Sequence, residues 1–90
     1  MGTDTGKADI VVEVLYFAHA RELVGKSSDV FRLQEGWTTS DLQVEVLRKC
    51  PALEKMLLVC AWALNERYLD GPESLQNGDK LALIPPISGG

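Results

Sequence analysis

The sequence predicts a single α+β domain in which a mixed β-sheet packs on one main helix and an extended tail follows the last strand. Ninety residues suffice for one small core, and 46% hydrophobic and 24% charged residues are ordinary for a globular domain. Short stretches of strand character surround one stretch with helical periodicity. We expect a flexible lead-in over residues 1–8, the domain over residues 9–84 and a protruding tail over residues 85–90.

The first half of the chain is expected to form strand, helical turn and strand. Residues 10–17, IVVEVLYF, are almost continuously apolar, which predicts a central strand covered on both faces. Residues 18–24 favour a short helical turn that Gly25 would close. Residues 29–33, DVFRL, alternate as a half-buried strand does.

The main helix follows and runs to about Lys49. Thr38 is a candidate N-cap with Asp41 three residues later, but Ser40 competes for the same role. Pro51 stops the helix, because proline lacks the N–H that a helix interior needs. Apolar residues at helical spacing predict a buried stripe formed by Leu42, Val46, Leu47 and Cys50.

The second half is expected to form a short turn and three strands. Residues 52–56 favour the turn, and residues 57–64, LLVCAWAL, predict a second strand covered on both faces. Asn65-Glu66 would turn the chain into a short strand over residues 67–69. After further turns, residues 81–84 form the last strand. The first and last strands are both strongly apolar, so we expect them side by side at the sheet centre.

Composition and spacing argue against several classes of function. The net charge of −4 and scattered basic residues disfavour nucleic acid and acidic membranes as partners. The sequence has no apolar membrane span and no apolar signal core near Met1, so the cytosol is the expected location. His19 is the only histidine, and Cys50 and Cys60 match no zinc or redox spacing. We expect no metal site, no bound cofactor and two cysteines that serve as small core residues.

The chain ends in LALIPPISGG, and this ending carries the candidate site. Pro85-Pro86 must end the sheet ladder, and six residues from there could span roughly 20 Å at about 3.3 Å each. Glycine has no Cβ, so Gly89 can pass where other residues would clash. Such a thread can enter a narrow active site of another protein, although an inert glycine tail is the plain alternative.

No internal group of side chains suggests catalysis, so the carboxylate of Gly90 is the candidate reactive group. A carboxylate is a poor electrophile and requires activation, most simply by ATP as an acyl-adenylate. The sequence shows no phosphate-binding loop, so a partner enzyme would have to use the ATP. The adenylate could then react with a sulfur donor to give a thiocarboxylate, or with a thiol and then an amine.

At these residues the chain resembles a known family, the MoaD-like small subunit of molybdopterin synthase. Near the start, the resemblance lies in Phe17-Ala18, Arg21-Glu22-Leu23 and Gly25. The second half is similar in Leu64-Asn65, Leu75, Gly78-Asp79 and the whole ending from Leu81 to Gly90. The Pro-Pro-apolar-Ser/Thr-Gly-Gly ending is the specific signal, whereas a glycine tail alone is shared with ubiquitin and other sulfur carriers.

The resemblance implies a ubiquitin-like β-grasp fold and a role as a sulfur carrier. An E1-like adenylyltransferase and sulfurtransferase would use ATP to adenylate Gly90, which would become a thiocarboxylate. The tail would then insert into a large, MoaE-like subunit and pass sulfur to cyclic pyranopterin monophosphate, forming the molybdopterin dithiolene of the molybdenum cofactor. The assembly would be a heterotetramer whose catalytic side chains belong to the large subunit.

The expected site is therefore narrow. Gly90 carries the activated group, Gly89 gives clearance, and the inserted stem comprises Pro85, Pro86, Ile87 and Ser88. Strand alternation puts Ala82 and Ile84 on one face of the last strand, so Ile84 belongs either to the core or to a partner surface. Three rivals remain: a sulfur carrier for thiazole synthesis or tRNA thiolation, a modifier conjugated to lysines, and an interaction domain with an inert tail.

Overall fold

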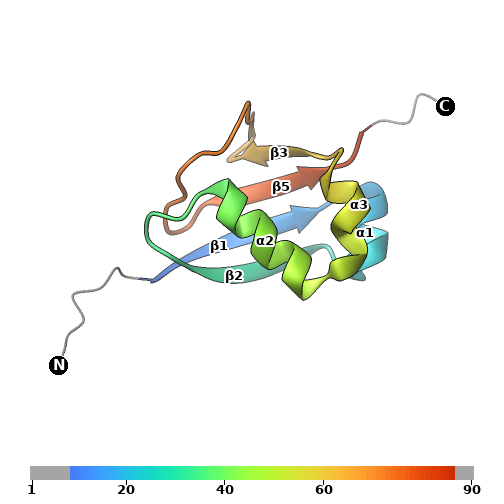
Figure 1. Ribbon diagram of the computed structural model, residues 1–90, viewed down its shortest axis with the longest axis horizontal. Coiled ribbons are helices and arrows are strands. Elements are labelled where there is room, and N and C mark those ends of the chain that lie inside the picture. Colours follow the sequence, from blue (N-terminus) through green and yellow to red (C-terminus); the bar gives the residue numbers. More distant parts are fainter. Residues whose placement is uncertain (1–8, 87–90) are drawn as a thin grey trace.

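A computed structural model describes residues 9–86 of the chain, so the lead-in predicted for residues 1–8 lies outside it. One five-stranded mixed sheet has the order β2-β1-β5-β3-β4. The helix α2 crosses one face of this sheet, and α1 and α3 lie near the end where β1 and β5 finish (Figure 1). This is the predicted α+β architecture, with one main helix on a mixed sheet.

The two central strands come from opposite ends of the described chain. β1 (Asp9–Tyr16) pairs antiparallel with β2 (Ser28–Gln34) and parallel with β5 (Lys80–Ile84). β5 also pairs antiparallel with β3 (Ala61–Leu64), which forms a hairpin with β4 (Arg67–Tyr68). The prediction that the first and last strands lie side by side at the sheet centre is confirmed.

The helices begin and end where local sequence signals place them. Gly25 closes α1 (Ala18–Val24) with a φ of 88°, and its N–H donates to the Arg21 carbonyl. Thr38, not Ser40, caps α2 (Thr39–Lys49): its Oγ1 accepts from the Ser40 N–H at 3.2 Å, and Asp41 Oδ2 accepts from the Thr38 N–H at 2.8 Å. The chain then forms the short helices η1 (Pro51–Leu53) and α3 (Glu54–Leu57).

Two details of the predicted strands were wrong. Residues 57–60 do not belong to a strand, because Leu57 ends α3 and the next residues turn, so β3 starts only at Ala61. The predicted cover on both faces of the first and third strands is also absent. Within the described chain, helices cover only one face, and the opposite face exposes apolar side chains such as Val11, Val30 and Tyr68.

The core lies between the covered face of the sheet and the helices. Alternate residues of the two central strands supply it, including Val14, Leu81 and Leu83, each 0% exposed. α2 contributes Leu42 and Val46, as its periodicity predicts, and Leu47 and Cys50 are partly buried against the same cluster. The core therefore fixes β5 firmly up to the residue from which the tail departs.

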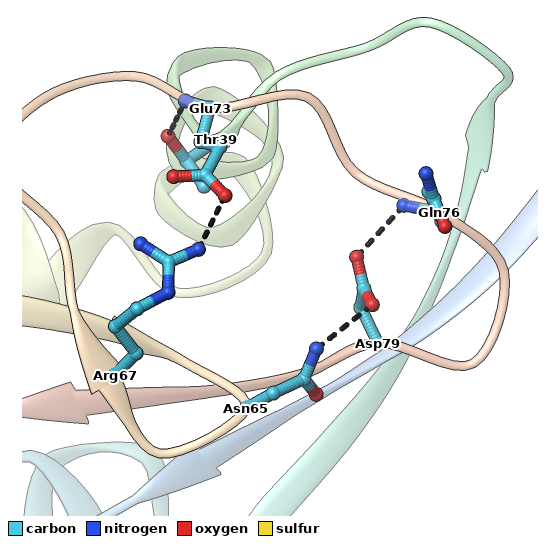
Figure 2. Close-up of polar contacts among 6 residues, drawn as sticks. All are labelled: Thr39, Asn65, Arg67, Glu73, Gln76 and Asp79. Carbon is cyan, nitrogen blue, oxygen red and sulfur yellow. Dashed lines mark hydrogen bonds and ion pairs between the residues drawn. The ribbon is translucent and has the colours of Figure 1, made fainter.

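Polar contacts fix the other end of β5. Asn65, in the β3–β4 turn, donates through Nδ2 to Asp79 Oδ1 at 3.0 Å and accepts from the Lys80 N–H through Oδ1 at 3.0 Å. Asp79 also accepts from the Gln76 N–H at 2.8 Å (Figure 2). The two Asn65 bonds tie the β3–β4 turn to the start of β5, and the Gln76 bond closes the turn just before it, so β5 is held at its beginning as well as along the strand.

The middle of the same connection is tied to α2. The Glu73 N–H donates to Thr39 Oγ1 at 3.1 Å, and the Glu73 carboxylate pairs with Arg67 of β4 (Figure 2). The loop between β4 and β5 is therefore attached both to the edge strand and to the first turn of the helix.

Candidate functional site

The stem of the tail leaves the sheet at the end of β5, which is the middle strand of the five. β5 is paired on both sides there: Tyr16 lies opposite Leu83, and Ala61 lies opposite Ile84. Pro85 is half-buried and Pro86 is exposed. The other assigned tail residues, Ile87, Ser88, Gly89 and Gly90, lie outside the described residues, so their roles stay predictions.

A shallow apolar groove lies beside the stem on the uncovered face of the sheet. We call it the open-face groove; its volume is about 500 Å³, and its apolar lining includes Leu15, Phe17, Ala63, Tyr68, Ala82 and Ile84. The register explains the hollow floor, because Leu15, Ala82, Ala63 and Tyr68 lie in one row across four strands, and the two alanines at its centre are small. Phe17 and Tyr68 are 46% and 65% exposed.

Backbone turns place the two aromatic residues at the rim of this groove. After Phe17 the chain turns sharply into α1, with Ala18 at a φ of 51° and the Phe17 carbonyl accepting from the Ala20 N–H. Asn65 and Glu66 have φ values of 49° and 73°, as the two-residue turn of a tight hairpin requires. That turn brings Tyr68 back opposite Ala63 on the uncovered face.

The structure places Ile84 in this groove. The predicted alternation is confirmed: Leu81 and Leu83 are buried on the core face, whereas Ala82 and Ile84 are half-buried on the opposite face. The alternative that Ile84 belongs to the core between sheet and helices is therefore excluded. Its contact with a partner stays a prediction.

The chemistry of the groove is that of a binding surface. Among the described residues that line it, Glu66 and Lys80 are the only charged ones, and none is a cysteine, serine or histidine. Phe17, Tyr68 and Ile84 offer exposed apolar area next to the stem, which is typical of the centre of a protein–protein interface. These features suit the groove to holding a partner.

The remaining ionisable groups do not form a second reactive centre. Within residues 9–86 no three His, Cys, Asp or Glu side chains are placed to hold a metal ion, and none of the helices there has the length and hydropathy to span a membrane. Cys50 and Cys60 are partly buried against the core. Burial raises the pKa of the Cys60 thiol, which reduces its reactive thiolate fraction.

One buried carboxylate, Asp29 of β2, was missed in the sequence and is structural. Its Oδ1 accepts from Lys26 Nζ at 2.9 Å and from Lys49 Nζ at 3.0 Å, and its Oδ2 accepts from the Tyr16 hydroxyl at 3.2 Å. Burial opposes ionisation, but these hydrogen bonds outweigh it and lower the pKa of Asp29. Burial and the nearby Asp29 charge raise the pKa of the Tyr16 hydroxyl. The cluster joins β1, β2 and α2.

Two residues of the open-face groove were also missed. The alternation in residues 10–17 could have revealed Phe17, because it falls on the same face as Leu15 and opposite the buried Tyr16. Tyr68 could have been found as an aromatic residue in an edge strand that is too short to bury it. The signal at Phe17 was hidden by the expectation that the first strand is covered on both faces.

Comparisons with known proteins place the sequence in a family. The model of the ThiS family matches residues 14–90. A molybdopterin synthase sulfur carrier subunit from Chlamydomonas reinhardtii is 41% identical over 88% of this chain and 98% of its own length. One from Arabidopsis thaliana is 40% identical over 92% of this chain and 86% of its own length.

Solved structures share the fold over nearly their whole length. SAMP1 from Haloferax volcanii superposes with a TM-score of 0.80 at 26% identity, covering 89% of this chain and 99% of that one. A complex of subunits 1 and 2 of molybdopterin-converting factor from Helicobacter pylori contains a chain with a TM-score of 0.67 at 28% identity, covering 90% and 100%. The fold is thus the ubiquitin-like β-grasp. The chain belongs to the ThiS family, among relatives that are molybdopterin synthase sulfur carrier subunits.

Proposed function

We propose that this chain is the sulfur-carrier subunit of a molybdopterin synthase and that the Gly90 carboxylate carries the sulfur. The observation that supports it most strongly is the similarity to curated sulfur carriers over nearly their full length. The structure adds a binding surface beside the root of the tail, where a protein that receives the tail would have to contact the domain.

The chemistry begins with activation of Gly90 by an E1-like partner. A carboxylate oxygen of Gly90 attacks the α-phosphorus of ATP, and pyrophosphate leaves. Hydrosulfide supplied by the partner then attacks the acyl carbon: a C–S bond forms, the C–O bond to AMP breaks, AMP leaves with that electron pair, and the sulfur loses its proton. The resulting thiocarboxylate is ionised at neutral pH and, as a soft nucleophile, displaces an oxygen substituent of cyclic pyranopterin monophosphate. Water then cleaves the thioester between the sulfur and the Gly90 acyl carbon, which returns the Gly90 carboxylate and leaves the sulfur on the precursor. A second charged carrier supplies the other sulfur of the molybdopterin dithiolene.

The chain itself holds and presents this group, and the catalytic side chains belong to the large subunit. Two sulfurs are required for each dithiolene, so two charged carriers are consumed per product. This stoichiometry suits a heterotetramer in which two carriers flank a dimer of large subunits. The net charge of −4 and the scattered basic residues of the sequence disfavour nucleic acid and acidic membranes as partners. We also propose that the protein is cytosolic.

The open-face groove is the proposed docking surface for the large subunit. The Helicobacter pylori relative was solved as a complex of subunits 1 and 2, so a partner of this kind fits the fold. Phe17 and Tyr68 are aromatic anchors with exposed area to bury, and Ile84 connects them to the stem. Docking there would position the tail for insertion into the active site of the large subunit.

Intact-mass spectrometry tests the proposal directly. The chain is incubated with ATP, an E1-like activator and a sulfur donor, and fragmentation then locates any added mass. Replacement of one oxygen by sulfur at Gly90, followed by molybdopterin formation when the large subunit and precursor are added, would support the role. A chain without Gly90 is the control. No mass shift with an activator that charges another carrier would contradict the proposal.

The second candidate function is a modifier attached to lysines through Gly90. The similarity to SAMP1, a small archaeal modifier protein, favours it specifically. In that case cells would contain isopeptide-linked adducts that end in this tail, and the adenylate would react with a thiol and then an amine. A stable pool of free thiocarboxylate without such adducts would favour a sulfur carrier over a modifier. Transfer of its sulfur through the large subunit would then favour molybdopterin synthesis over another sulfur-carrier pathway.

A further inference from the structure

A second groove flanks the stem on the side away from the open-face groove. We call it the helix-side groove; it has a volume of about 630 Å³, and its lining includes Leu23, Lys55, Met56, Val59, Pro85 and Pro86. Residues of α1 and α3 therefore meet the root of the tail here. The open-face groove ends at Ile84 and the helix-side groove contains the next two residues, so the two surfaces are continuous through the stem.

The helix-side groove offers apolar area that the domain does not use for its own core. Val59 is 62% exposed and Leu23 is 37% exposed, although both are branched aliphatic side chains. Both lie within a groove rather than scattered singly over the surface, and such a patch next to a functional segment is typical of an interaction site.

We propose that the large subunit holds the stem from both sides, seating an apolar side chain and a neighbouring carboxylate of its own in the helix-side groove. This inference rests on the proposed function and adds a second contact surface to it. A tunnel that encloses the tail must surround Pro85 and Pro86 where they leave the sheet. When one side of the tunnel entrance on the large subunit covers the open-face groove, the opposite side of that entrance therefore faces the helix-side groove.

The charge of the helix-side groove determines which partner side chains can bind there. Lys55 lines the groove and takes part in no ion pair within residues 9–86. His19 also lines the groove, and its Nδ1 already contacts Glu22 Oε1 at 3.1 Å. A carboxylate on the partner's rim would therefore pair with Lys55, whereas a basic rim would be repelled.

The test compares two neighbouring substitutions in the full-length chain. Val59→Asp places a charge in the groove, whereas Leu58→Asp introduces the same charge at a residue that is 80% exposed and does not line it. Isothermal titration calorimetry against the purified large subunit should show roughly tenfold or greater loss of affinity for Val59→Asp and little change for Leu58→Asp. Thermal midpoints of both variants report whether each is folded.

Charge reversal at Lys55 gives an independent reading. Lys55→Glu should weaken binding several-fold at low salt, mainly through a slower association rate, and the difference from the unmodified chain should shrink as salt is added. Because this side chain is exposed, the variant should fold normally. A salt-independent effect, or none, would overturn the acidic-rim part of the proposal.

A third measurement separates this proposal from the proposed function. Thiocarboxylation of Gly90 by the E1-like activator should proceed at a similar rate for Val59→Asp and for the unmodified chain. Unchanged affinity of Val59→Asp for the large subunit, with normal thiocarboxylation, would overturn the helix-side contact and leave the sulfur-carrier role intact. Unchanged affinity with slowed thiocarboxylation would assign the groove to the activating enzyme instead, which also overturns the proposal.

Discussion

Truncation of Phe17 to alanine should weaken binding of the large subunit without destabilising the domain. A phenylalanine side chain buries about 150–250 Å², and the 46% of Phe17 that is exposed corresponds to roughly 70–115 Å² that a partner could cover. At about 25 cal/mol per Å², covering that area contributes about 2–3 kcal/mol. Its loss corresponds to a roughly 20- to 100-fold increase in Kd.

The measurement is a calorimetric titration of the large subunit with the unmodified chain and with Phe17→Ala. Val44→Ala is the matched control, because Val44 is 55% exposed on α2, away from the open-face groove. It should bind the large subunit normally, and both variants should unfold near the midpoint of the unmodified chain. Equal affinities for Phe17→Ala and the unmodified chain, or an equal loss for Val44→Ala, would refute the assignment of the interface to the open face.

Three further predictions concern the tail, the core and the buried carboxylate. Deleting Gly90 should abolish sulfur transfer and leave the thermal midpoint nearly unchanged, since the core is complete within residues 10–83; a large drop in midpoint would contradict the separation of tail and core. Leu83→Ala should lower the free energy of unfolding by about 2–5 kcal/mol in urea titrations, because Leu83 is 0% exposed at the sheet centre. Asp29→Asn should cost about 1–3 kcal/mol at neutral pH, because the lysine pairs are lost. Since folding lowers the pKa of Asp29, this stabilisation is complete above its ordinary value of 3.8 and is lost as the pH falls through the lowered value; a difference between the two proteins that persists unchanged in strong acid would contradict the assignment.

Local signals were sufficient for much of the fold. Thr38 with Asp41 marked the start of α2, Gly25 marked the end of α1, and alternation marked the buried face of β2. These features depend on neighbours in sequence, so they can be read without knowing the tertiary contacts. The adjacency of β1 and β5 followed from their shared apolar character.

The incorrect predictions have one physical origin. An apolar run favours burial of a segment, but it does not show which of its residues are buried, in what conformation or by which molecule. Leu57 is buried as the last residue of a helix, and Leu58, the next residue of the run, is 80% exposed. In β1 the apolar residues Val11 and Leu15 lie on the face that the chain's own helices leave uncovered.

In the candidate site, too, one part was predicted from the sequence and the other part required the structure. The tail was predicted from the sequence, because its prolines and glycines impose backbone behaviour regardless of their surroundings, and its role stays a prediction. Both grooves required the structure, since each combines residues that are far apart in sequence: Phe17 with Tyr68 in one, and Leu23 with Val59 in the other. Only the strand register and the placement of α1 and α3 bring these residues together.

The central position of β5 has a consequence for folding. β1 with β2, and β3 with β4, are local hairpin-like units, but they join only through β5, and the pairing of Glu13 with Lys80 closes a long loop of chain. Such distant contacts form late and slowly compared with local ones. Before β5 inserts, neither groove exists and the stem has no fixed direction. With the grooves as the proposed docking surfaces, a chain that has not finished folding would present neither of them to a partner.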